Sequence, residues 1–144
     1  MLRMSDALHP IRMIDVGEKP VTLRTARASA RLRAAPETIR RIRAGTLEKG
    51  DAIATARLAA IMAAKRTSDV VPLCHPLPLD SVAATIDFAE PDAVVIETVV
   101  AASAAALAIY DMCKSIDPGM TIERVQLEEK TGGVRGDYTR AAHA

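Results

Sequence analysis

The sequence predicts a single α+β domain in which helices pack on one face of a mainly antiparallel sheet. Apolar residues alternate along 26–32 and again along 82–88, which is typical of half-buried strands. Between them, an alanine-rich stretch has high helix propensity and ends in Lys65 and Arg66, cations that suit a helix C-terminus. At 144 residues the chain is long enough to bury one sizeable core.

The first expected strand spans Val21 to Leu32. Its two faces differ sharply, with Ala26, Ala28, Ala30 and Leu32 on one side and Arg27, Ser29, Arg31 and Arg33 on the other. Val21 and Leu23 are out of phase with the later apolar set, so we expect a bulge near Thr25. Two helices should follow. Pro36 can open the first and Gly45 can close it, and Asp51 is the expected N-cap of the second, over 52–66.

The second half of the chain continues with a strand at Val82–Phe88, a turn at 90–92 and a strand at Ala93–Val100. A helix over 101–116, a turn at Pro118-Gly119 and a strand over 121–130 complete the domain. The domain is expected to span 13–138, with flexible termini at 1–12 and 139–144.

Composition narrows the class of protein. Aromatic residues make up 2% of the chain and Trp is absent, so the core must consist of Ala, Val, Ile, Leu and Met. Such side chains bury little area each, so we expect oligomerisation to contribute. The first ten residues do not resemble a signal peptide, no apolar run is long enough to span a bilayer, and two cysteines make no disulfide framework. We therefore expect a cytoplasmic protein that does not enter a membrane.

Charge is unevenly distributed along the chain. The first 50 residues carry 11 Lys and Arg against 5 Asp and Glu, whereas the remainder carries 8 against 13. A basic half suggests contact with an anion such as phosphate or nucleic acid, or with the acidic half of a neighbouring subunit. Nucleic acid is the weaker alternative, because few aromatic side chains are available for stacking and no nucleic-acid motif is present.

A proline-rich segment follows the alanine-rich helix. Pro72, Pro76 and Pro78 fix the backbone and remove three donors, which excludes an ordinary helix or a central strand. This stiffness would hold Leu73, Cys74 and His75 as the wall of a binding site; the alternative is a connector with a surface histidine. Cys74 has no identifiable histidine base, so an inert thiol is expected. Scattered histidines indicate no metal site, and we expect no cofactor.

Four further residues could carry chemistry. Asp111 and Lys114 share a helix face, as an acid–base pair or as a solvated salt bridge. Lys49 precedes an expected helix N-terminus, a suitable place for phosphate, although it could be a solvated loop lysine. Lys130 begins a short Gly-Gly loop that could bind an anion but lacks the spacing of a phosphate loop.

Four segments together resemble one family. MIDVGEKPVTLRTARA (13–28), KGDAIATARLAAIMAAKRTSDVVPLCHPLPL (49–79), AASAAALAIYDMCKSID (101–117) and EKTGGVRGD (129–137) are similar to molybdenum cofactor biosynthesis protein C, the cyclic pyranopterin monophosphate synthase. The resemblance covers nearly the whole chain beyond residue 12. It implies a ferredoxin-like α+β fold, a homohexamer built as a trimer of dimers, and active sites between subunits.

The resemblance also implies an activity. Such a lyase converts (8S)-3',8-cyclo-7,8-dihydroguanosine 5'-triphosphate to cyclic pyranopterin monophosphate and diphosphate. By residue match, Asp111, Lys49 and Lys114 would be catalytic, and Leu73, Cys74, His75 and Lys130 would bind substrate. A carboxylate–lysine pair can transfer protons if its pKa is tuned, and cations stabilise charge on a leaving diphosphate.

Two departures from the family pattern are visible. A segment like TGKTGVEMEALT, which contacts substrate in the family, is missing between Val100 and Ala101, where the sequence offers no turn residues. Val134 replaces a family lysine, and Arg135 follows it. The alternative to an active synthase is therefore a catalytically impaired member that serves as a ligand-binding or structural subunit of the hexamer.

Overall fold

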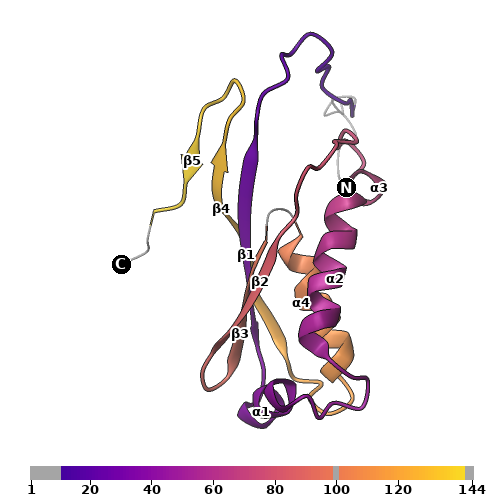
Figure 1. The fold of residues 1–144 in the computed structure, drawn as a ribbon, viewed down its shortest axis with the longest axis vertical. Helices are drawn as coiled ribbons and strands as arrows, with labels where there is room; N and C mark the ends of the chain where they lie inside the picture. The colour runs from indigo at the N-terminus through magenta and orange to yellow at the C-terminus, as the bar shows by residue number, and fades with distance from the viewer. Residues whose placement is uncertain (1–10, 99–100, 142–144) are drawn as a thin grey trace, which may run out of the picture.

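The computed structural model describes residues 11–98 and 101–141 (Figure 1). Its regular elements are β1 (Thr25–Arg33), α1 (Pro36–Ala44), α2 (Ala52–Lys65), α3 (Thr67–Val70), β2 (Ala84–Ala89), β3 (Ala93–Thr98), α4 (Ala102–Cys113), β4 (Thr121–Thr131) and β5 (Tyr138–Thr139). The five strands form one antiparallel sheet in the order β2-β3-β1-β4-β5.

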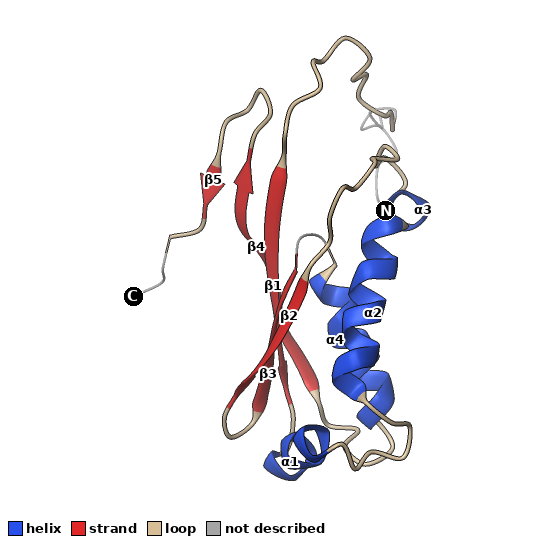
Figure 2. Ribbon diagram, in the orientation of Figure 1, coloured by secondary structure: helices blue, strands red, loops and turns tan. Residues whose placement is uncertain are grey.

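The expected α+β architecture is confirmed. Helices α2 and α4 lie side by side on one face of the sheet, and α1 sits at one end of it (Figure 2). Taken without α1, α3 and β5, the elements follow the order strand, helix, strand, strand, helix, strand, which is the split βαβ order of the ferredoxin-like expectation. Among the described residues, none of the helices has the length and apolar character needed to cross a membrane.

Small side chains let the helices approach each other and the sheet closely. On α2 every fourth residue is a buried alanine, and α4 buries three more; the set is Ala52, Ala56, Ala60, Ala64, Ala102, Ala105 and Ala106. The largest fully buried side chains come from the strands and from α1 and α4, namely Leu32, Ile39, Val94, Ile96, Ile109 and Cys113. The core is therefore aliphatic, as the composition predicts.

Helix ends follow the sequence signals closely. Asp51 Oδ1 accepts hydrogen bonds from the backbone N–H groups of Ile53 (2.9 Å) and Ala54 (3.0 Å), which is the expected N-cap of α2. Gly45 adopts a left-handed φ of 67° and ends α1. Helix α1 has no cap of its own at Ala35. Instead, Asp117 accepts from the Ala35 N–H at 2.8 Å, which ties the loop after α4 to the start of α1.

The first strand is shorter than predicted. It begins at Thr25, because its last partner on β4 is Thr131, and residues 11–24 form an extended arm in which Val21 and Leu23 are exposed. The β1–β4 register shifts close to the bulge expected near Thr25, between Arg27 and Ala28, and it shifts a second time between Arg31 and Leu32.

Remaining differences concern the ends of elements. The short α3 and β5 were not expected, and β5 carries Thr139 one residue beyond the expected domain end at 138. The expected strand extension over 99–100 lies outside the described residues, as do 1–10 and 142–144 of the expected flexible termini.

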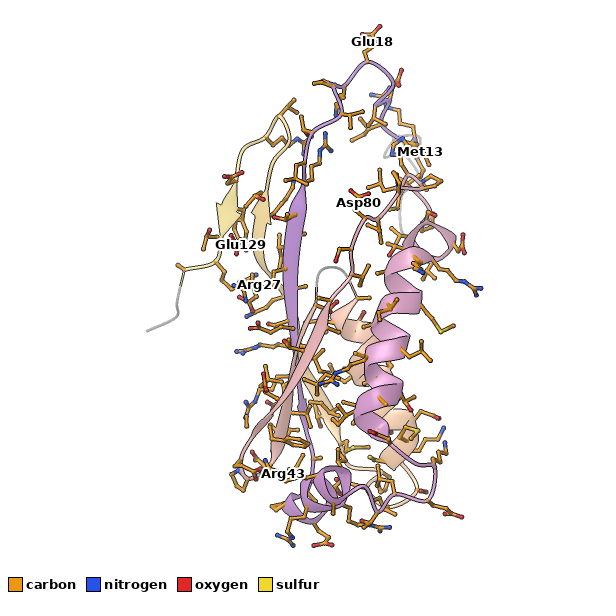
Figure 3. The ribbon with its side chains drawn as sticks, viewed as in Figure 1. Met13, Glu18, Arg27, Arg43, Asp80 and Glu129 are labelled. Atoms are coloured by element: carbon orange, nitrogen blue, oxygen red, sulfur yellow. The ribbon has the colours of Figure 1, made fainter. Side chains whose placement is uncertain are left out.

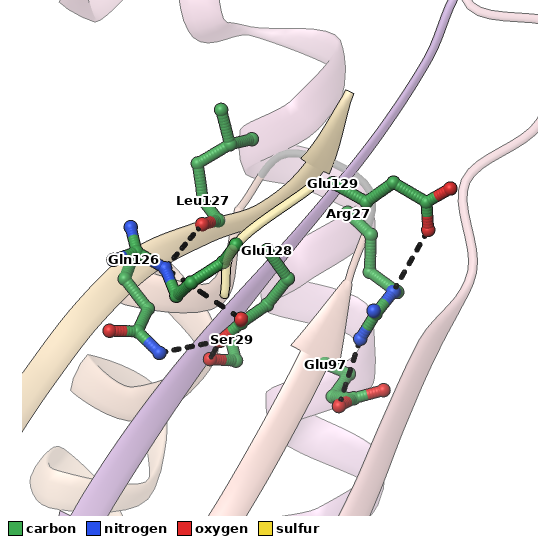
Figure 4. A network of polar contacts seen from close by, with 8 residues as sticks. Arg27, Ser29, Glu97, Gln126, Leu127, Glu128 and Glu129 are labelled. Atoms are coloured by element: carbon green, nitrogen blue, oxygen red, sulfur yellow. Dashed lines mark hydrogen bonds and ion pairs between the residues drawn. The ribbon is translucent and has the colours of Figure 1, made fainter. Parts of the chain in front are cut away.

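The basic face of β1 meets acidic side chains of the same chain. Arg27 lies between Glu97 and Glu129, at 3.2 Å and 3.8 Å (Figures 3 and 4). Arg31 and Arg33 both pair with Glu123 of β4, at 3.0 Å and 2.7 Å. The positive charge on this face of β1 is therefore neutralised by carboxylates of the same chain, and these arginines are not free to bind an external anion.

Candidate active site

One group of predicted site residues forms a charged cluster. Lys49 Nζ lies 2.9 Å from Asp111 Oδ2 and also donates to the Asp111 backbone oxygen at 3.0 Å. Lys114 Nζ lies 2.7 Å from the other carboxylate oxygen, Asp111 Oδ1. The carboxylate is thus held between two ammonium groups on the surface of a single copy, with all three side chains about half exposed.

Local structure explains why these three residues meet. Asp111 and Lys114 lie three apart at the C-terminal end of α4, so they share one side of that helix. Lys49 precedes Gly50, whose φ of 100° turns the chain into α2 just before the Asp51 cap. Helices α2 and α4 pack against each other, which brings the loop before α2 to the end of α4 (Figure 1).

The cluster shifts the acid–base properties of its members. Hydrogen bonds from Lys114 and then Lys49 lower the pKa of Asp111 from 3.8 to about 2. The same bond to Asp111 raises the pKa of Lys114. In a single copy, Asp111 and Lys114 are therefore both charged at neutral pH, and the carboxylate is a weak base.

A second group of predicted residues lines a cleft of about 340 Å³. Leu73 and His75 come from the proline-rich segment, and Lys130 comes from the end of β4. The arm contributes further cations, so that the charged residues of the cleft are Arg12, Lys19, Arg24, Lys130 and Arg135. None of these five forms an ion pair with a described carboxylate, which makes the cleft strongly attractive to an anion.

The Gly-Gly loop lies directly against the arm. Gly132 and Gly133 have left-handed φ values of 80° and 86°. A Cβ on Gly132 would lie only 2.3 Å from the backbone oxygen of Leu23, and one on Gly133 would lie 3.5 Å from Arg24 Nε. This close approach needs glycine, and it places the arm beside Lys130 and Arg135.

The two groups lie at opposite ends of the molecule. The Lys49 cluster is at the N-terminal end of α2, whereas the proline-rich segment follows α3 at its C-terminal end (Figure 1). An α-helix rises about 1.5 Å per residue, so the 14 residues of α2 separate the ends by roughly 20 Å. Figure 3 shows Arg43 of α1 toward one end of the molecule and Met13 and Glu18 of the arm toward the other. One copy therefore does not unite the predicted site.

The cysteines are placed as inert thiols would be. Cys74 is half-buried, and its Sγ lies 3.5 Å from the backbone oxygen of His75. Cys113, the last residue of α4, is buried, and desolvation raises its pKa to about 11. Neither cysteine is bonded to the other. Within residues 11–98 and 101–141, no group of three His, Cys, Asp or Glu side chains is placed to hold a metal ion.

Sequence reasoning missed the arm residues Arg12, Lys19 and Arg24 as candidates. The available signal is the excess of cations in the first 50 residues, which suggests contact with an anion or with an acidic neighbouring subunit but does not single out these three residues. The structure divides that excess into arginines paired on the sheet and cations around the cleft that form no ion pair with a carboxylate of residues 11–98 or 101–141.

Two features of the junction between β3 and α4 fit an abrupt connection: the helix lacks a side-chain cap, and a buried hydroxyl lacks a partner among the described residues. Helix α4 begins at Ala102, and its N-cap residue, Ala101, makes no side-chain cap. Thr98 is buried, and its Oγ1 has no hydrogen-bond partner in the described part of the chain. Residues 99–100, which directly precede the expected gap between Val100 and Ala101, lie outside the described residues.

Comparisons with known proteins agree on one family. The MoaC family profile matches residues 13–133. A Mycobacterium tuberculosis protein named cyclic pyranopterin monophosphate synthase 1 is 50% identical over 145 residues, covering 91% of this chain and 85% of the relative. Cyclic pyranopterin monophosphate synthase of Herpetosiphon aurantiacus is 49% identical over 154 residues, covering 96% and 93%. That of Thermomicrobium roseum is 46% identical over 144 residues, covering 90% and 87%.

The alignments also reveal a gap. Those with the first two relatives run over 145 and 154 positions, more than the 144 residues of this chain, although neither takes in the whole chain. These relatives therefore contain residues without a counterpart here, which agrees with a segment missing between Val100 and Ala101. Identity near one half across most of both chains, together with the profile match, establishes that the chain belongs to the MoaC family.

Proposed function

We propose that this chain is a cyclic pyranopterin monophosphate synthase of molybdenum cofactor biosynthesis. As a lyase it converts (8S)-3',8-cyclo-7,8-dihydroguanosine 5'-triphosphate to cyclic pyranopterin monophosphate and diphosphate. The observation that carries this proposal is the presence of a cationic cleft, without acidic partners among the described residues, together with a separate lysine–carboxylate cluster. A triphosphate substrate needs the first, and a ring rearrangement needs the second.

The cleft binds the triphosphate. Lys130, Arg24 and Arg135 lie within one cavity and lack acidic partners among the described residues, so they can form charge-assisted bonds to phosphate oxygens. The same groups stabilise negative charge on diphosphate as it leaves. Leu73 and His75 line the same cavity and contact the substrate from a segment stiffened by prolines. Cys74 lies between Leu73 and His75 in the sequence.

The Lys49–Asp111–Lys114 cluster transfers protons. In a free copy the two lysines keep the carboxylate charged and weakly basic, because its pKa is about 2. Substrate and a second copy covering the cluster would remove water and compete for the ammonium groups. Both effects raise the pKa of the carboxylate toward the range in which it accepts a proton.

The two halves of one complete site must come from two different copies of the chain. Since α2 holds them roughly 20 Å apart in one chain, the cluster of one copy meets the cleft of another in a homohexamer, assembled as a trimer of dimers. Exposed apolar side chains on α2 and α4, namely Leu58, Met62 and Leu107, are available for such contacts. The domain of 13–138 is the unit of this assembly. A substrate derived from guanosine triphosphate fits a cytoplasmic location.

Turnover is the direct test of this function. Purified chain is incubated with the cyclised triphosphate, and pterin and diphosphate are quantified. Replacing Asp111 by Asn should lower the rate by about a hundredfold or more, since general acid–base groups contribute about 10²–10⁴. Asp87→Asn is the matched control, because Asp87 is an exposed carboxylate on β2 outside both halves of the site. Equal rates for the two variants contradict the proposal.

A second reading is favoured by the gap against the relatives and by the uncapped start of α4. In that reading the chain is a catalytically impaired subunit that binds ligand within the hexamer. Inserting TGKTGVEMEALT between Val100 and Ala101 separates the two. A large gain in turnover with unchanged assembly supports impairment, whereas equal rates with and without the insertion support a working synthase.

A further inference from the structure

The loop that joins β4 to β5 is held by one carboxylate. Lys130 pairs with Tyr138 as the last rung of the β4–β5 ladder, so residues 132–137 form the connection. Inside this loop Asp137 Oδ1 accepts a hydrogen bond from the backbone N–H of Gly132 at 2.9 Å. Asp137 forms no ion pair with a described cation, so this bond is the contact its carboxylate makes.

The bond acts at the point where the loop touches the arm. Gly132 is the residue whose missing Cβ lets the loop approach the Leu23 backbone oxygen, and Gly133 lies beside the Arg24 guanidinium. Any rotation of the Gly132 peptide would therefore change the spacing between the arm and the loop. Three of the cations around the cleft depend on that spacing: Arg24 on the arm, Lys130 before the loop and Arg135 within it.

We propose that Asp137 is a positioning residue for phosphate binding: by accepting the Gly132 N–H it sets the loop shape that directs Arg24, Lys130 and Arg135 toward one anion. This inference rests on the proposed function for the identity of the ligand. A carboxylate next to a cationic cleft would by charge alone weaken phosphate binding, and its geometric role opposes that effect. A suitable pair of variants distinguishes the electrostatic role from the geometric role, because the two roles predict opposite changes in phosphate affinity.

Asp137→Ala removes both the acceptor and the charge, whereas Asp137→Asn removes the charge and keeps an oxygen that can accept from Gly132. The probe is inorganic tripolyphosphate, titrated calorimetrically at fixed ionic strength. We expect Asp137→Ala to weaken binding about three- to tenfold, in line with the net contribution of one typical hydrogen bond, and Asp137→Asn to bind at least as tightly as the parent. Asp87→Ala, which removes a remote carboxylate, should change the affinity by less than about twofold.

Hydrogen exchange at the Gly132 amide gives an independent readout. Exchange should accelerate in Asp137→Ala and stay near the parent rate in Asp137→Asn. Equal tripolyphosphate affinities for the Ala and Asn variants, or unchanged Gly132 exchange in the Ala variant, overturn the inference. Failure of the proposed function is distinguishable, because it appears as absent pterin formation by the parent chain, while the binding and exchange comparisons still decide the role of Asp137.

Discussion

Two glycines of the β4–β5 loop allow a matched test of how the cleft is built. Gly132 and Gly136 both have left-handed φ values, 80° and 76°. They differ in surroundings, since a Cβ on Gly132 would lie 2.3 Å from the Leu23 backbone oxygen, whereas a Cβ on Gly136 would meet nothing within 4 Å. Replacing each by alanine therefore separates the cost of the backbone conformation from the cost of the contact.

The magnitude of each effect follows from these surroundings. A left-handed conformation costs an L-residue about 1–2 kcal/mol, so both variants should lose about that much free energy of unfolding. Gly132→Ala must in addition relieve the clash. Non-bonded atoms prefer a separation of about 3.5 Å, so the loop and the arm must move apart by roughly 1 Å. A displacement of that size can lower the effectiveness of a binding or catalytic group by about 10²-fold.

Tripolyphosphate titration and urea unfolding, run on both variants, test this reasoning. Gly136→Ala should bind within about threefold of the parent, and Gly132→Ala should bind about ten- to a hundredfold more weakly. Gly132→Ala should also lose more unfolding free energy than Gly136→Ala, because only Gly132 has the added contact with the Leu23 backbone. Equal affinities for the two variants would refute the claim that contact between loop and arm shapes the cleft. A Gly136→Ala variant that binds as weakly as Gly132→Ala would show that the backbone conformation alone matters.

Two further predictions concern the cluster end of the molecule. Asp51→Ala should lower the free energy of unfolding by about 1 kcal/mol, because two α2 amides lose their acceptor, whereas Asp51→Asn should stay close to the parent in the same urea titration. Carbon NMR should show a pKa of about 2 for the Asp111 carboxyl. Because this lies below the ordinary value of 3.8, the carboxylate's contribution to stability is fully present above pH 3.8 and is lost as the pH falls toward 2. Lys114→Met should raise that pKa toward 3.8, and by more than Lys49→Met does, because the Lys114 hydrogen bond is the larger cause. An unmoved midpoint in Lys114→Met would contradict the geometry of the cluster.

Much of the fold could be predicted because local signals and burial agree. The helix over 52–65 combines alanine propensity, an aspartate cap and a terminal lysine, and all of these point to the same limits. The strands over 84–89 and 93–98 show apolar patterning with a clear turn between them. The start of β1 could not be predicted, because Val21 and Leu23 look like strand residues and only the end of β4 at Thr131 decides where pairing stops.

Sequence reasoning proposes residues for the site but not where each of them lies in one copy of the fold. Resemblance supplied Lys49, Asp111, His75 and Lys130, yet nothing in a linear sequence shows that α2 holds them at opposite ends of one copy. The shift of the Asp111 pKa away from neutrality was also unforeseen, because it depends on Lys49, 62 residues earlier in the chain, reaching the end of α4. Distant contacts of this kind arise from packing of α2 on α4 rather than from sequence spacing.

The central claim is that the cluster of one copy and the cleft of another form one catalytic site. Mixing two variants tests it most directly. Asp111→Asn and Lys130→Met are each expected to be inactive alone, and after joint refolding the mixture should regain about a quarter of the parent pterin formation, because random assembly of a site shared by two copies restores that share of sites. A mixture no more active than either variant by itself would contradict the claim.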